Sequence, residues 1–170
     1  MPREPITFRK YKALDMPLGM RDPDLGGEET AIDVIGLNFY PRNQLRLRGG
    51  PVPLGHHDYR PLAELLAEVY DRCRKTAVHC RGRHSARPIW LSYVAQGVRT
   101  AIAEGIPVHG ICIYPVTDYR GWDNDQICRV GLFGSPAENG TRPVYRPLIE
   151  ELRRQQILSG HVPHAAHRES

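Results

Sequence analysis

The chain has 170 residues, of which 41% are hydrophobic and 25% charged, the composition of an ordinary globular domain with a core of its own. Its formal net charge is +4, but Lys and Arg are spread along the chain without a long basic run, so we expect no nucleic-acid partner. No apolar run approaches the roughly 20 residues that cross a bilayer, so we expect no membrane partner either.

The cysteines form no paired C-x-x-C motif; they are Cys73, Cys80, Cys112 and Cys128. The first residues, 1–5, lack the apolar core of a secretory signal. We therefore expect a cytoplasmic protein. Because disulfides are rare in such a reducing compartment, we expect its thiols to be reduced. Cys112 and Cys128 could form a thiol pair, but two isolated buried thiols are the favoured interpretation. We expect no cofactor.

Residues 1–30 are expected to form an irregular N-terminal segment, because four prolines and the Gly26-Gly27 pair interrupt any long helix. Within it, residues 11–16 can form a short helix. The first strand is predicted at 32–40, where apolar residues run into Asn38 and Tyr40. A loop rich in Gly and Pro follows over 41–59, and its His56-His57 pair is interpreted as a loop feature without chemistry.

Two helices and a second strand are predicted next. The helix at 60–74 has an apolar face at three- and four-residue spacing, made of Leu62, Leu65, Leu66, Val69 and Tyr70. The helix at 88–104 is expected to bury one side that carries Ile89, Val94, Val98 and Ile102. The run at 108–116 is almost entirely apolar, which is typical of a strand buried on both faces in a parallel sheet.

A last helix is predicted at 144–158, and residues 159–170 are expected to be a mobile tail. The loops that follow strands are long, whereas the turn from helix to strand at 104–107 is short. Enzymes built as α/β barrels show this asymmetry, because their functional residues lie on the loops after the strands. The sequence therefore predicts an α/β fold.

The strand ending Ile35-Gly36-Leu37-Asn38-Phe39-Tyr40 resembles the sixth barrel strand of glycoside hydrolase family 1, which reads like DFIGLNYY. The stretch from Gly110 to Asp118, followed by Trp122, resembles the eighth strand of the same barrels, although the Tyr-to-Asp interval is one residue shorter. The resemblance implies a partial (β/α)8 barrel over residues 31–158, roughly the last three βα units. It also implies that Asn38, Tyr40, Asp118 and Trp122 are the remnant of a sugar-binding site.

The catalytic carboxylates of that family are absent from the sequence. Retaining glycosidases need a carboxylate nucleophile and a carboxylic acid partner. By position, Arg81 stands where the resemblance implies the nucleophilic Glu, and no Asn-Glu-Pro motif for the acid/base residue occurs. The polar segment 75–84 is also not expected to form a good buried strand. We therefore predict no catalytic residues.

A shift of reading frame can explain the segment around Arg81. One set of codons compatible with residues 76–82 is ACC GCT GTT CAT TGC CGA GGC, in which we chose the third bases. A one-base shift of this set gives Pro-Leu-Phe-Ile-Ala-Glu, the expected strand and its nucleophile. We hypothesise two compensating frameshifts that flank residues 75–84. The nucleotide sequence tests this hypothesis, because codons that exclude the shifted reading would contradict it.

A metal site is the alternative for the same segment, since His79, Cys80 and His84 lie close in sequence and Cys73 is near. Their spacing matches no common zinc pattern, so we predict no metal site.

Three functions remain open for the chain. The first is a truncated or degenerate β-glycosidase-like protein that is inactive alone. The second is a carbohydrate-binding or interaction module, and the third is the C-terminal part of a split glycosidase. The expected partners are a carbohydrate and either a complementary barrel chain or a second copy, because three strands cannot close a barrel and leave exposed edges and apolar faces.

Overall fold

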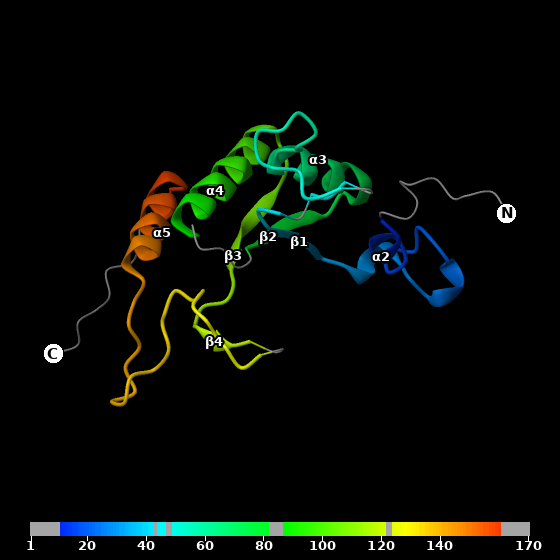
Figure 1. Cartoon of the computed structure of the whole chain (residues 1–170). Helices are drawn as coiled ribbons and strands as arrows, with labels where there is room; N and C mark the ends of the chain where they lie inside the picture. The colour runs from blue at the N-terminus through cyan, green and yellow to red at the C-terminus, as the bar shows by residue number, and fades with distance from the viewer. Residues whose placement is uncertain (1–10, 43, 47–48, 82–86, 122–123, 161–170) are drawn as a thin grey trace.

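The computed structural model describes residues 11–42, 44–46, 49–81, 87–121 and 124–160, and for residues 76–81 it describes the backbone only. The chain is α/β. Three strands, β1 (Val34–Phe39), β2 (Thr76–Arg81) and β3 (Val108–Ile113), form a parallel sheet in the order β1-β2-β3. Helix α3 (Leu62–Cys73) connects β1 to β2, and α4 (Arg87–Ala103) connects β2 to β3 (Figure 1).

The predicted strand at 32–40 and the three long helices are confirmed within about two residues at each end, the last helix as α5 (Arg146–Leu158). The strand predicted at 108–116 ends earlier, at Ile113. Tyr114 and Pro115 leave the sheet, and a proline has no N–H to continue a ladder of hydrogen bonds.

The segment 75–84 was expected to make a poor strand, and that expectation is wrong for residues 76–81. They form β2, which pairs with β1 from Val34↔Thr76 to Phe39↔Arg81 and with β3 from Ala77↔Val108 to Arg81↔Ile113. A central strand finds hydrogen-bond partners on both sides, and this pairing outweighs the low strand preference of its polar residues.

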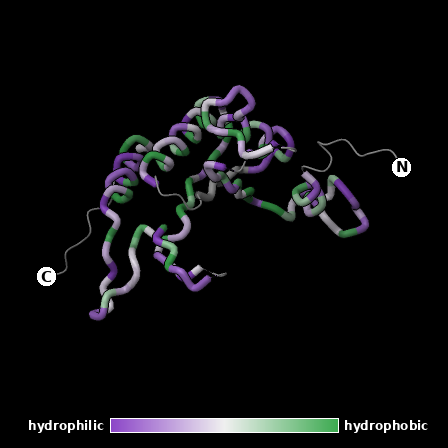
Figure 2. The backbone as a smooth tube through the Cα atoms, viewed as in Figure 1, coloured by the Kyte–Doolittle hydropathy of each residue, from purple (hydrophilic) through white to green (hydrophobic). Residues whose placement is uncertain are grey.

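Helices α3 and α4 lie on the same side of the sheet and form the core with it (Figure 1). The largest fully buried side chains of this core are Phe39, Leu62, Leu66 and Val94. Figure 2 shows hydrophobic stretches along β3 and the segment that leads into β1, and hydrophilic stretches in the outer loops.

The predicted buried side of α4 is partly wrong. Val94 and Val98 are buried as expected, but Ile89 is 75% exposed and Ile102 is 50% exposed. The buried face instead consists of Trp90, Leu91, Val94, Ala95, Val98 and Ala101. Ile89 precedes Trp90 by one residue, about 100° around the helix, which turns its side chain toward solvent.

The N-terminal segment contains α2 (Lys12–Asp15) and two short 3-10 helices, η1 (Pro23–Leu25) and η2 (Glu29–Ala31). It is attached to α3 through Asp15, which is 2% exposed and accepts two hydrogen bonds from the guanidinium of Arg72, at 2.7 and 2.6 Å. The same guanidinium lies over the ring of Tyr11, 4.7 Å from its centre.

Beyond β3, a hairpin of β4 (Tyr119–Arg120) and β5 (Ile127–Cys128) leads to α5, which packs on α4 (Figure 1). Of the tail expected to be mobile, residues 161–170 lie outside the described residues. No helix in the described part of the chain is long and apolar enough to span a membrane.

Candidate functional site

The carboxyl end of β1 carries the first two predicted site residues. Asn38 is the last residue but one of the strand, and Tyr40 follows the strand and is 40% exposed. Side chains alternate along β1, so that Ile35 and Phe39 are buried while Val34 and Asn38 are exposed. Asn38 therefore faces away from α3 and α4.

The carboxyl end of β2 carries Arg81. It is the last residue of the middle strand, in register with Phe39 of β1 and Ile113 of β3. Since parallel strands end at the same edge of a sheet, Asn38, Tyr40 and Arg81 share that edge. A guanidinium cannot attack an anomeric carbon, and its positive charge would oppose an oxocarbenium-like transition state.

Asp118 lies in the loop after β3, where it organises the backbone. Its Oδ1 accepts a hydrogen bond from the Gly131 N–H at 2.8 Å, and its own N–H donates to the Phe133 carbonyl at 2.8 Å. A Cβ at Gly131 would lie 2.3 Å from the Asp118 nitrogen, so only glycine fits this close approach. One carboxylate oxygen is thus occupied in holding the loop. Trp122, the fourth predicted residue, lies outside the described residues.

A cavity of about 240 Å³ adjoins Asp118, and sequence reasoning missed it. Its polar lining includes Arg87 from the start of α4, Arg129 and Tyr145. The Arg87 guanidinium lies 4.0 Å from the centre of the Tyr145 ring and donates a hydrogen bond to the Gly131 carbonyl. The cavity thus joins residues from α4 and from the loop between β5 and α5, a combination that only the tertiary fold produces.

The metal site considered around β2 does not gain support from Cys73. Burial raises the pKa of its thiol, which keeps it protonated near neutral pH. Cys73 ends α3 before the start of β2, whereas Cys80 lies near the other end of that strand, about 13 Å further along at the usual rise per residue. His84 lies outside the described residues. In the part of the chain that the structure describes, Cys73, Cys112 and Cys128 are free thiols.

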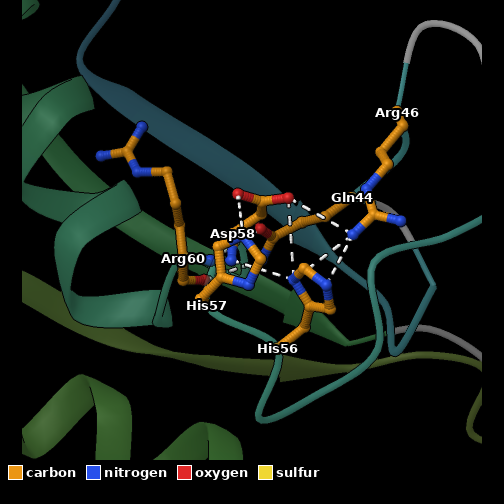
Figure 3. A network of polar contacts seen from close by, with 6 residues as sticks. All are labelled: Gln44, Arg46, His56, His57, Asp58 and Arg60. Carbon is orange, nitrogen blue, oxygen red and sulfur yellow. Dashed lines mark hydrogen bonds and ion pairs between the residues drawn. The ribbon is translucent and has the colours of Figure 1, made fainter.

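A different group of metal-ligating side chains exists among the described residues. His56, His57 and Asp58 each offer a ligand atom, and these atoms lie within 4.8 Å of one another (Figure 3). From the sequence, the two histidines were expected to be a loop feature without chemistry. The unbroken run of three ligand-type residues between Gly55 and Tyr59 is the sequence signal that points to this group.

No family model matches the chain, and no curated protein does. Solved structures do match. A β-glucosidase mutant derived from a hyperthermophilic tetrameric structure aligns with a TM-score of 0.64 and 20% identity, over 94% of this chain and 38% of that one. The β-glycosidase of the hyperthermophile Thermosphaera aggregans aligns with a TM-score of 0.55 and 19% identity, over 79% of this chain and 34% of that one.

The β-glucosidase of Thermotoga maritima, in a complex with deoxynojirimycin, aligns with a TM-score of 0.54 and 14% identity, over 85% of this chain and 40% of that one. This chain has the fold of part of a β-glycosidase. The predicted resemblance is therefore confirmed at the level of the fold, and the chain spans 34–40% of the length of these three structures.

Proposed function

We propose that residues 31–158 are the last three βα units of a family 1 type (β/α)8 barrel, and that the chain is a degenerate β-glycosidase-like protein without hydrolytic activity of its own. Three parallel strands in sequential order, joined by helices on one side, support this proposal. So does the position of the long loops, which follow β1 and β3.

The observation that carries the proposal is Arg81 at the carboxyl end of β2. Asn38 and Tyr40 stand beside it at the end of β1, where the resemblance implies residues that contact sugar. The strand that would supply the nucleophile ends in a cation instead. Sugar contacts without a nucleophile correspond to weak binding rather than to hydrolysis, because binding alone does not lower the barrier of the chemical step.

The residual sugar surface consists of Asn38, Tyr40, Asp118 and Trp122. An exposed amide, a carboxylate and aromatic rings are groups that hydrogen-bond hydroxyls and stack on sugar rings. This surface supports the second candidate function, a carbohydrate-binding or interaction module. The third, a split glycosidase completed by another chain, needs that chain to supply both carboxylates, since Arg81 can replace neither.

The purified full-length chain, assayed with aryl β-glucosides and β-galactosides and titrated with the free sugars, separates these functions. We expect no hydrolysis above the blank, and a small saturable change in Trp fluorescence at millimolar sugar that N38A and W122F abolish. The exposed-site variant L54A is the control and should respond as the parent does. Hydrolysis that survives repurification would overturn the proposal, whereas a flat titration would remove only the sugar surface.

A further inference from the structure

The loop between β1 and α3 is held in place at several points around His56, His57 and Asp58. The Gln44 side-chain amide pairs with the backbone of Arg60, donating to its carbonyl at 2.7 Å and accepting from its N–H at 2.9 Å. Val52 and Tyr59, on either side of the histidines, are 5% and 9% exposed and belong to the core. The three residues therefore sit on a short, fixed span between two buried anchors.

The ligand atoms on this span lie within 4.8 Å of one another, somewhat wider than the spacing around a small divalent ion. The Nε2 atom of His57 lies 3.1 Å from Oδ1 of Asp58, and Nδ1 of His56 lies 3.7 Å from Oδ2 of Asp58. Ligands at a tetrahedral zinc ion are about 3.3–3.5 Å apart, given metal–ligand bonds of about 2.0–2.2 Å. Small side-chain rotations would close the remaining difference, and the half-exposed Asp58 and exposed His57 leave the site open to solvent.

Arg46 already places a positive charge at this position. Its Nη2 atom lies 3.3 Å from Oδ2 of Asp58 and 2.6 Å from Nε2 of His56. The N–H of Asp58 also points at the His56 ring, 3.0 Å from Nδ1. A neutral imidazole has one nitrogen lone pair, so it can accept only one of these two donors. Figure 3 shows the Arg60 side chain directed away from the three residues. Of the two arginines drawn, Arg46 is therefore the one whose side chain contacts them.

We propose that His56, His57 and Asp58 form a binding site for a divalent transition metal ion such as Zn²⁺, and that Arg46 competes with the ion for it. Two imidazoles and one carboxylate are ligands that such ions prefer, and a coordination position remains for water. The bound ion is coordinated by the Asp58 carboxylate and by the lone pair of His56, and it displaces Arg46 from both groups. This site is independent of the proposed glycosidase ancestry, since it uses neither Arg81 nor the sugar surface.

The test is a calorimetric titration of the full chain with Zn²⁺ alone, in the variant H161Q/H164Q/H167Q, because histidines of the C-terminal tail could add binding of their own. We expect one ion per chain in this background, and at least about a tenfold loss of affinity in H57N and in D58N. The variant R46Q should bind about tenfold more tightly, because it removes the competing charge.

Two results would overturn the proposal. One is equal affinity in the background protein and in H56N/H57N, which would place the bound ion elsewhere. The other is unchanged or weaker binding by R46Q. Thermal unfolding of each variant without metal accompanies the titration, so that a loss of affinity is counted only for a folded protein. The gain of affinity expected in R46Q is a second safeguard, because misfolding would lower the affinity.

Discussion

Asp15 is a buried carboxylate whose ion pair holds the N-terminal segment to α3. It is 2% exposed, and Arg72 donates two hydrogen bonds to it. Removing one partner of a buried pair costs several kcal/mol, but the Arg72 side chain is 28% exposed and keeps part of its hydration. We expect D15N to lower the free energy of unfolding by about 2 kcal/mol, measured by urea denaturation.

The matched control for D15N is D71N. Asp71 faces Arg74 at 3.8 Å, and the two side chains are 73% and 69% exposed. Exposed pairs contribute little because solvent screens them, so D71N should change the free energy of unfolding by less than about 0.5 kcal/mol. Equal urea midpoints for D15N and D71N would show that the N-terminal segment does not stabilise α3 through this pair.

Among the elements, α3 and α4 pack against each other closely at Gly97. A Cβ at this position would lie 3.0 Å from the Leu62 Cβ and 3.4 Å from its Cδ2, and Leu62 is 1% exposed. We expect G97L to lower the free energy of unfolding by about 2 kcal/mol, because a full side chain must displace a packed one. Helix propensity acts in the opposite direction, since leucine favours a helix more than glycine does.

The control for this helix contact is T100L, which places the same side chain on the exposed side of the same helix. Its unfolding free energy should stay within about 0.5 kcal/mol of the parent. If both variants are stabilised, propensity dominates and the close approach of the two helices at Gly97 is wrong.

The elements could be predicted where the chain repeats a local pattern. The apolar spacing of α3 predicts both its bounds and most of its buried face. Periodicity predicted the buried side of α4 only in part, because Ala95 and Ala101 pack in the core while Ile89 faces solvent. It also missed β2, whose stability comes from two neighbouring strands that are distant in sequence.

The residues of the candidate site could likewise be predicted where they belong to a local sequence pattern, and not where the fold brings distant residues together. Asn38 and Tyr40 could be placed from the sequence because they end a strand of recognisable pattern. The cavity beside Asp118 could not, because Arg87 and Tyr145 meet there only through the path of the chain after β3. For the histidine cluster the run of ligand-type residues was visible, but the distances among their atoms depend on the fold of the loop.

At the scale of the whole molecule, the sheet has two edges that the described residues leave unpaired, since β1 and β3 each pair with β2 alone there. Alternate residues of β1, including the 47% exposed Val34, face away from α3 and α4. Parallel sheets are normally covered on both faces, and exposed edges promote pairing with other chains. We therefore expect the chain to self-associate through this sheet.

The variant V34K/C112K tests this association by placing a lysine on each edge strand, a substitution that natural edge strands use to prevent pairing. Both parent side chains are exposed. Light scattering after gel filtration should show the parent chain as oligomers and V34K/C112K shifted toward monomer at equal concentration.

The control I89K/I102K adds the same charge at apolar positions of α4 that are 75% and 50% exposed, and should associate as the parent does. An equal shift in the control would mean that added charge alone prevents association. A parent chain that is monomeric would mean that the exposed sheet edges do not cause self-association.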